Sequence, residues 1–405
     1  MDGECREPHA HVLMTTLGVE EEYMFLDPTT LRPAGVAEAV RSELLQGQPR
    51  SRFVAHEFLA SQIERSTPVF HTLEQAAADL STFRRRLQVA ASQHHVVAAS
   101  IGTPFDSVGR PEITEDTRYQ TVESEFRGVV ADHLVNGVHV HVAIPDRTTG
   151  VHVLNRIRVW LPTLLSLVGN SPFWHATDTG FASWRAMQMR RWSTIGCPPP
   201  FRDGDDYDDR IRRLVGVGGT YDLKTIAWNA RLSEANPTVE VRVGDAQLDV
   251  AATVLLAALV RGLVSTAIRD TRAGIAPLEV EPELLDAALW HAARDGISGL
   301  LLNPATRRLE PAAEVVGAMV DSVAEALETE GDVDTVHEQI ARILVDGTGA
   351  TRQRAAMRAG GRKALGRLFA TALASRYTGS DARPGSVLQS CGASRGRGSS
   401  STGEV

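Results

Sequence analysis

The chain has 405 residues, 43% of them hydrophobic and 23% charged, which is the composition of an ordinary soluble globular protein. Its formal net charge of −8 gives no reason to expect nucleic acid as a partner. Cys5, Cys197 and Cys391 are far apart and odd in number, which argues against a disulfide framework or a zinc ribbon and fits a reducing cytoplasm.

Neither the N-terminus nor the most apolar run predicts contact with a membrane. Residues 1–8 are polar and acidic, unlike a secretion signal. Residues 250–268 are apolar but are interrupted by Arg261, so we expect a buried helix there and no membrane span.

The first predicted strand, residues 18–23, has the sequence GVEEEY. Successive side chains of a strand point to opposite faces, so Glu20 and Glu22 share one face. A run of three glutamates is also typical of a solvated edge, and this segment alone does not separate a functional site from a surface.

The following segments alternate between polar positions and helix signals. Glu57 and Glu64 lie seven residues apart, which puts them on one face of a helix but would need a bulge in a strand. The sequence leaves both alternatives open. A capping box formed by Thr72 and Gln75 then begins a clear helix, and residues 95–101 read as a strand.

A second pair of polar residues lies in the middle of the chain. Residues 114–134 predict an amphipathic helix, which leads into a strand at residues 138–142 with the sequence VHVHV. His139 and His141 share one face of this strand, and valines occupy the other. The pattern fits a functional site and an exposed face about equally well.

A loop-rich region separates this strand from the next helix-rich part. Residues 148–168 predict a helix kinked near Pro162. Residues 173–200 contain three tryptophans, which could line a substrate entrance or a contact in a homo-oligomer. From residue 282 the apolar pattern is helical.

The third polar strand, residues 239–243, reads VEVRV and places Glu240 and Arg242 on one face. Strands of this kind among helices predict an α+β fold with an antiparallel or mixed sheet, covered by helices on its apolar side. We expect a single domain over residues 13–376, followed by a disordered Gly-, Ser- and Arg-rich tail at residues 378–405.

The polar faces of these strands suit a hard metal ion and an anionic substrate. Carboxylates outnumber imidazoles and thiolates are missing, which favours Mg²⁺ or Mn²⁺ over zinc. Arg242, Arg231 and Arg185 could neutralise phosphoryl or carboxylate charge by bidentate contact. The sequence contains no G-x-x-x-x-G-K-[ST] motif, so ATP would not be held by a P-loop.

Three longer motifs occur in a specific order: LGVEEE at residues 17–22, NGVHVHV at residues 136–142 and TVEVRVGD at residues 238–245. Together they resemble the carboxylate–amine ligases of the glutamate–cysteine ligase type 2 family. Shorter matches extend the resemblance over about residues 13–360, and they are RY at 118–119, DTGFAS at 178–183, WNAR at 228–231, ARDG at 293–296 and GTGA at 347–350.

The resemblance implies a fold like the catalytic domain of glutamine synthetase, with a curved, mainly antiparallel sheet, helices on its convex face and Mg²⁺–ATP on the concave one. It also implies ATP-dependent joining of the glutamate γ-carboxylate to an amine, with cysteine as the family's named acceptor. The reaction passes through an acyl phosphate and releases ADP and phosphate.

The same resemblance implies roles for individual residues. Arg242 would contact phosphate and act in catalysis with Glu240, while Arg231 and Arg185 would contact ATP or substrate. His141 is supported less strongly as a ligand than its neighbour two residues earlier. The implied metal ligands are Glu20, Glu22, Glu57, Glu64, His139 and Glu240.

Two other functions remain open at this point. A metal-dependent hydrolase could use His139 and His141, although such enzymes usually draw further histidines from later strand ends. A non-catalytic nucleotide-binding homologue could keep the fold and the ligand set without turnover.

Overall fold

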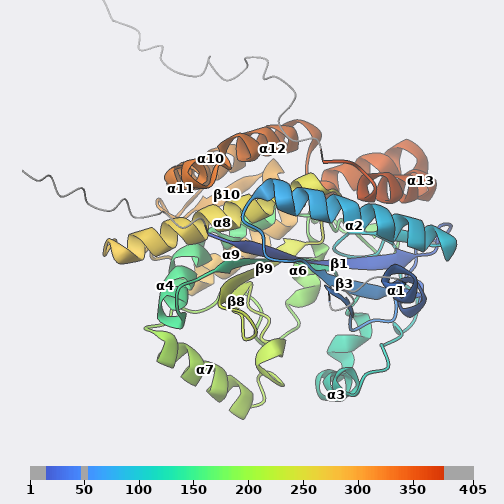
Figure 1. Ribbon diagram of the computed structural model, residues 1–405, viewed down its shortest axis with the longest axis horizontal. Coiled ribbons are helices and arrows are strands. Elements are labelled where there is room, and N and C mark those ends of the chain that lie inside the picture. Colours follow the sequence, from blue (N-terminus) through green and yellow to red (C-terminus); the bar gives the residue numbers. More distant parts are fainter. Residues whose placement is uncertain (1–14, 47–52, 378–405) are drawn as a thin grey trace, which may run out of the picture.

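The computed structural model describes residues 15–46 and 53–377, and a seven-stranded sheet lies at its centre (Figure 1). Along the sheet each strand pairs with its neighbours in antiparallel fashion, which confirms the expected fold class. The order is β2 (Val54–His56), β3 (Gln62–Ser66), β1 (Leu17–Leu26), β5 (Gly137–Ala143), β9 (Thr238–Asp245) and β8 (Ala230–Leu232), with β4 (Val97–Ala99) paired to β1.

One face of the sheet is apolar and is buried under helices, as the valine pattern predicted. The valines of β5 and β9 belong to one large core cluster with the apolar side chains of the covering helices. These helices are α2 (Leu73–Gln93), α4 (Arg147–Ile157), α5 (Leu161–Leu167) and α8 (Val250–Arg272).

The expected buried helix is α8. By length and composition it could cross a membrane, because its most apolar 18-residue segment has a mean hydropathy of 1.9. However, 83% of that segment is buried inside the molecule. It packs against α2, α4, α11 (Ala324–Glu330) and α12 (Val333–Asp346), so it is the central helix of the apolar layer.

The α2 helix begins where its capping box predicted. Thr72 Oγ1 accepts a hydrogen bond from Gln75 N at 3.3 Å, and Gln75 Oε1 accepts one from Thr72 N at 3.4 Å. Each end of the reciprocal cap satisfies an amide that the first helical turn leaves unpaired.

Two predicted helices are shorter than expected. The segment at residues 114–134 forms α3 (Thr117–Phe126), then the 3₁₀ helix η2 (Arg127–Asp132), because Arg127 adopts a left-handed φ of 49°. The segment at residues 148–168 breaks at η3 (Arg158–Trp160), before Pro162. That proline lies in the first turn of α5, where its missing N–H costs nothing.

Other short elements were not expected from the sequence. Residues 173–200 include a small hairpin and α6 (Trp184–Met189), and the region after residue 282 contains a β-hairpin as well as helices. The remaining elements are α1 (Ala37–Leu45), β6 (Phe173–Trp174), β7 (Thr177–Asp178), α7 (Gly204–Gly216), η4 (Leu223–Thr225), α9 (Pro282–Asp295), η5 (Gly296–Ser298), β10 (Leu300–Asn303), β11 (Arg308–Pro311), α10 (Ala312–Ser322) and α13 (Gly349–Leu373).

Two expectations concern parts of the chain outside the described residues. The predicted disordered tail at residues 378–405 lies there, as do Cys5 and Cys391. Cys197 is a free, half-buried thiol whose burial raises its pKa to about 12. A thiol with this pKa is a poor nucleophile at neutral pH.

The three consecutive glutamates of β1 are not a solvated edge. Glu21 points into the apolar face and is 1% exposed. It forms an ion pair with the fully buried Arg84 and accepts a hydrogen bond from Thr253 Oγ1 at 2.7 Å. A buried carboxylate requires such partners, and they come from α2 and α8.

Candidate active site

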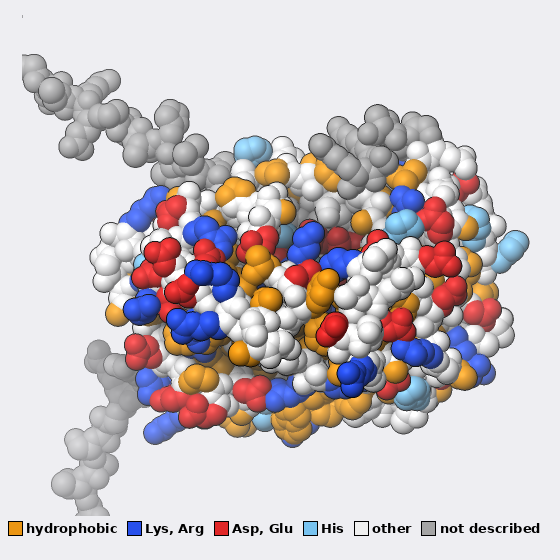
Figure 2. All heavy atoms as spheres, turned by 90° about the horizontal axis from the view of Figure 1, so that it is seen from below, with side chains coloured by type: hydrophobic (Ala, Val, Ile, Leu, Met, Phe, Trp, Pro, Cys, Tyr) orange, Lys and Arg blue, Asp and Glu red, His pale blue; other side chains and the backbone are white. Residues whose placement is uncertain are grey.

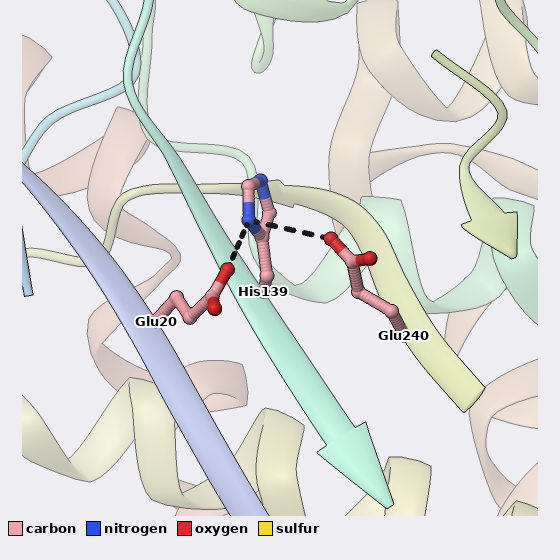
Figure 3. Close-up of side chains that lie close together, drawn as sticks. All are labelled: Glu20, His139 and Glu240. Carbon is pink, nitrogen blue, oxygen red and sulfur yellow. Dashed lines mark hydrogen bonds and ion pairs between the residues drawn. The ribbon is translucent and has the colours of Figure 1, made fainter. Parts of the chain in front are cut away.

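The polar face of the sheet brings Glu20, His139 and Glu240 together from three neighbouring strands (Figure 3). Glu20 on β1 lies directly opposite His139 on β5. His139 Nδ1 is 3.2 Å from Glu20 Oε2 and 3.7 Å from Glu240 Oε1. One ligand atom from each residue lies within 4.8 Å of the others, close enough to hold one metal ion.

A second group shares the same imidazole. Glu22 on β1 lies opposite Glu64 on β3, and His139 Nε2 is 3.7 Å from Glu22 Oε1. Ligand atoms of Glu22, Glu64 and His139 again fall within 4.8 Å of one another. The two ring nitrogens of His139 therefore face two adjacent sets of carboxylates: Glu20 with Glu240, and Glu22 with Glu64.

The position of Glu57 resolves the alternatives that the sequence left open. Glu57 follows the end of β2 and Glu64 lies within β3, so the pair shares neither a helix nor a bulged strand. Glu57 belongs to neither triad, but after burial its charge is the next cause that raises the pKa of Glu22 and of Glu64. It therefore adds negative charge to the second group.

The electrostatics of the second group favour a bound cation. Burial first, and then the neighbouring carboxylates, hold the pKa of Glu64 well above its usual range, and the pKa of Glu22 and Glu57 is also raised. Burial and the charge of Arg242 lower the pKa of His139, which keeps its imidazole neutral. Oxygen-rich sites with a neutral imidazole suit Mg²⁺ or Mn²⁺.

Arg242 lies beside the first group because β9 contains a bulge. Between Val138 and Val140 on β5 the register advances by two residues, whereas β9 advances by three. The extra residue redirects the strand next to His139. Arg242 Nη1 lies 3.4 Å from His139 Nδ1 and forms an ion pair with Glu240.

Arg231 on β8 lies opposite Glu240 and holds it from the other side. Its Nε donates to Glu240 Oε2 at 2.8 Å, and its Nη1 donates to the carbonyl oxygens of Lys224 and Ile226 at 2.9 Å. Burial opposes ionisation of Glu240, but the charges of Arg242 and Arg231 keep its pKa below the usual range. Glu240 is therefore an anion fixed between two guanidinium groups.

Arg185 reaches the edge of this face from α6. Its Nη2 donates to the carbonyl oxygen of Arg242 at 3.4 Å, and its buried Nε has no hydrogen-bond partner among the described residues. Gly137 makes this approach possible, since a Cβ there would lie 2.5 Å from Arg185 Nη2. A cavity of about 40 Å³ beside Arg185 and Arg242 also borders Asn229 and Met187.

His141 lies outside both groups. Its Nδ1 is 3.0 Å from Thr238 Oγ1, and its Nε2 is 3.5 Å from Glu20 Oε1. It lines the same face as His139 without sharing either set of three ligand atoms. The geometry thus gives no second histidine to either candidate metal position in the described part of the chain.

Asp245 holds the segment that carries Arg185, a role that the sequence analysis did not predict, since it named this residue only as part of a motif. It accepts hydrogen bonds from Asn170 N, Ser171 Oγ and Ser183 Oγ, each at 2.7 Å. These contacts fix the segment that carries Arg185 to the end of β9. The available signal was the aspartate that follows glycine at the end of the alternating strand.

Charged side chains cover the outer surface below the sheet and also join two of its segments. Figure 2 shows the molecule from below, the side opposite α2, where acidic and basic groups are interspersed. Arg118 on α3 and Asp222, the cap of η4, form an ion pair at 3.2 Å between segments 104 residues apart. This ion pair therefore joins α3 to the start of η4.

Comparison with known proteins places this site in a family. The model of glutamate–cysteine ligase family 2 matches residues 16–371. A protein of Saccharopolyspora erythraea, provisionally named glutamate–cysteine ligase 2-2, is 41% identical over 361 residues, 89% of this chain and 92% of its own. A provisionally named glutamate–cysteine ligase 2 of Streptomyces coelicolor is 36% identical over 341 residues, 84% of this chain and 94% of its own.

Solved structures show the same fold at low identity. A glutamate–cysteine ligase from Francisella tularensis, in complex with AMP, aligns with a TM-score of 0.60 and 11% identity over 88% of each chain. A bifunctional glutathione synthetase from Pasteurella multocida aligns with a TM-score of 0.61 and 15% identity, over 87% of this chain and 51% of that one. The chain therefore belongs to glutamate–cysteine ligase family 2 and is a carboxylate–amine ligase.

Proposed function

We propose that the protein uses ATP and Mg²⁺ to join the γ-carboxylate of glutamate to an amine, with cysteine as the first candidate acceptor. Mn²⁺ is the alternative ion. The observation that carries the proposal is the pair of carboxylate groups sharing His139, with Arg242 beside them. The names of the relatives support the choice of glutamate and cysteine.

The chemistry explains why such a site needs both acidic and basic groups. A free carboxylate is a poor electrophile, so its oxygen must first attack the γ-phosphate of ATP to give an acyl phosphate and ADP. The amine then attacks the acyl carbon and phosphate leaves. No covalent intermediate with the protein is needed.

Different residues of the site would bind the metal ions and stabilise the charge of the reacting groups. Glu20, Glu240 and His139 would hold one ion, and Glu22 with Glu64 the other. A bound Mg²⁺ supplies charge neutralisation on the phosphate oxygens. Arg242, at the edge of the first group, would offset the repulsion between the carboxylate and phosphate anions and stabilise charge in the transferred group.

Arg231 would act on Glu240 instead of on the nucleotide. Both of its bonds to that carboxylate, and its bonds to the carbonyls of η4, are made within the protein. Arg185 has a free buried Nε in the described structure, so it is the better candidate to contact substrate. Of these two arginines, Arg231 would therefore position Glu240 and Arg185 would bind substrate.

The test is ADP release measured with Mg²⁺, ATP, glutamate and a panel of amines that includes cysteine, with product masses determined in parallel. We expect release to require both glutamate and an amine, and a γ-glutamyl product to form. Glu240→Gln should abolish turnover, whereas Glu310→Gln, on the remote β11, should retain it.

Other outcomes would contradict either the proposed function or the proposed site. Tight ATP binding without turnover on any amine would favour a non-catalytic nucleotide-binding homologue. Tightly bound zinc with hydrolytic activity would favour a metal-dependent hydrolase. Full turnover in Glu240→Gln would contradict the assignment of the site while leaving the ligase activity in place.

A further inference from the structure

An ion pair joins the two segments that flank the polar face on the side away from α2. Arg118 of α3 contacts Asp222 through two nitrogens, with Nε 3.3 Å from Oδ2 and Nη2 3.3 Å from Oδ1. Figure 1 shows α3 below the sheet, opposite α2. The side chains of Arg118 and Asp222 are 37% and 33% exposed. An ion pair this close to water is weak, so it can open without a large cost in free energy.

The two ends of this contact lead to the two candidate metal groups. Burial raises the pKa of Glu57, and Arg118 is among the charges that partly offset that rise, so its guanidinium lies within electrostatic reach of this carboxylate. On the other side, Arg231 donates to the carbonyl oxygen of Lys224 in η4 and to the carboxylate of Glu240. The ion pair therefore bridges the polar face between these two carboxylates.

The α3 side of the bridge is fixed to the sheet. Val122 of α3 packs in the same apolar cluster as Phe58, and Tyr119 Oη donates to the carbonyl oxygen of His56 at 3.3 Å. His56 and Phe58 are the neighbours of Glu57 in the chain. The helix is thus held directly to the segment that carries this carboxylate.

The η4 side has the features of a moving segment. Every residue of η4 is at least partly exposed. Gly216 and Gly218 precede it, a Cβ at either position would have open space around it, and Gly218 has a φ of 70°. Arg231 holds the far end through the carbonyl oxygens of Lys224 and Ile226, both at 2.9 Å. Glycines before a segment that is anchored at its other end are suited to act as a hinge.

We propose that Arg118 and Asp222 form a gate over the polar face, which opens by motion of residues 216–223 to admit ATP and closes to keep water from the acyl phosphate. This inference rests on the ligase function proposed above. Water that attacked the acyl carbon in place of the amine would return glutamate and phosphate, so ADP would be released with no amide formed. Closure of an active site prevents such side reactions.

Stopped-flow fluorescence with N-methylanthraniloyl-ATP and Mg²⁺ on the full-length protein tests the gate. A gate limits entry and exit alike, so Asp222→Asn should raise both the association and the dissociation rate constant about threefold and change Kd less than about twofold. Asparagine can still cap η4 through the bond to Thr225 N, so the segment should keep its fold. Arg118→Gln should have the same effect, and the double variant no larger one.

Arg110→Gln is the matched control. It removes another exposed ion pair of α3, the one with Glu123 on the same helix, and leaves the contact with η4 in place. Both rate constants should keep their wild-type values in this variant.

The ratio of ADP released to γ-glutamyl product measures the exclusion of water. In Asp222→Asn we expect this ratio to rise at least about twofold over the wild type, because water then competes with the amine. An unchanged ratio in a protein that forms product would overturn the gate, as would unchanged rate constants in both gate variants. Faster dissociation alone would also overturn it, since that result would make the pair a nucleotide contact.

The same measurements separate failure of the gate from failure of the proposed function. Binding of the nucleotide without product on any amine would contradict the ligase function, and the two rate constants would still decide whether the ion pair controls entry. Absence of nucleotide binding by the wild type would overturn both proposals.

Discussion

Arg231 Nε lies 2.8 Å from Glu240 Oε2, so an arginine expected to contact ATP or substrate is instead bound to a predicted metal ligand. The same guanidinium donates to backbone carbonyls at η4. It therefore couples the position of Glu240 to the wall of the polar face.

Replacing Arg231 by Gln should lower both activity and stability. Glu240 would keep Arg242 but lose the contact that sets its orientation, and η4 would lose its anchor. We expect the free energy of unfolding to fall by about 2 kcal/mol and ligase turnover to fall at least tenfold. Urea denaturation and the ADP-release assay measure the two effects.

The control for this variant is Arg147→Gln, which removes a surface pair with Asp208 whose side chains are both 43% exposed. A pair of that kind contributes at most about 1 kcal/mol, and turnover should not change. Equal effects of the two substitutions would show that Arg231 has no special relation to the site.

The two histidines of β5 should differ in metal binding. His139→Asn removes a nitrogen that faces both carboxylate groups, so we expect Mn²⁺ to bind at least about tenfold more weakly. His141→Asn removes a side chain bonded to Thr238 and should change the affinity less than about threefold. Titration followed by electron paramagnetic resonance measures free Mn²⁺, and equal losses would argue against the assigned triads.

Glu21 and Arg84 form a buried ion pair behind β1, and replacing both should cost less unfolding free energy than the sum of the two single replacements. Glu21→Leu alone leaves the Arg84 guanidinium buried without its counter-charge, and should cost about 3–5 kcal/mol. Glu21→Leu with Arg84→Met replaces both charges by apolar groups and should recover much of that loss. Urea unfolding of the two single variants and the double variant gives the coupling, and additive losses would contradict it.

Stability should depend on pH through Asp249. Burial opposes its ionisation, but hydrogen bonds and charges from Arg342 and Arg352 keep its pKa below the usual range. The ionised form therefore stabilises the fold above the unfolded-state pKa of about 3.9, and this contribution is lost as the pH falls toward the folded-state pKa.

The near-isosteric Asp249→Asn tests this dependence, because asparagine can still cap α8 through the bond that Asp249 makes to Ala252 N. We expect it to be about 2 kcal/mol less stable than the wild type at pH 7. The gap should narrow between about pH 5 and about pH 3. Urea midpoints across this range measure it, and a constant gap would exclude the carboxylate as its cause.

The sequence predicts the sheet well where alternation is strict. In β5 and β9 valines fill one face, and the polar residues between them fall on the other, so His139 and Glu240 could be assigned to one surface before the structure was known. Their closeness could not, because it depends on strand order. The β-bulge beside Arg242 depends on the register of both strands and leaves no local signal.

Where polar and apolar residues do not alternate, the sequence does not predict which side chains are buried. The three glutamates of β1 look alike in sequence, and only Arg84, 63 residues later, makes the middle one an interior residue. Glu57 and Glu64 could not be placed because β2 and β3 are short and a loop divides them. The roles of the predicted metal ligands and arginines remain predictions until metal and nucleotide binding are measured.

The buried pair of Glu21 and Arg84 also has a consequence for how the strand is aligned. If β1 slid by one residue against β5, Glu21 would leave its guanidinium and Glu20 and Glu22 would enter the valine layer without counter-charges. Such a slip exchanges one matched ion pair for two unmatched carboxylates. The buried ion pair between Glu21 and Arg84 thus favours a single register of β1 against β5. A misfolded state with a shifted β1 is therefore less stable even before any metal or substrate binds.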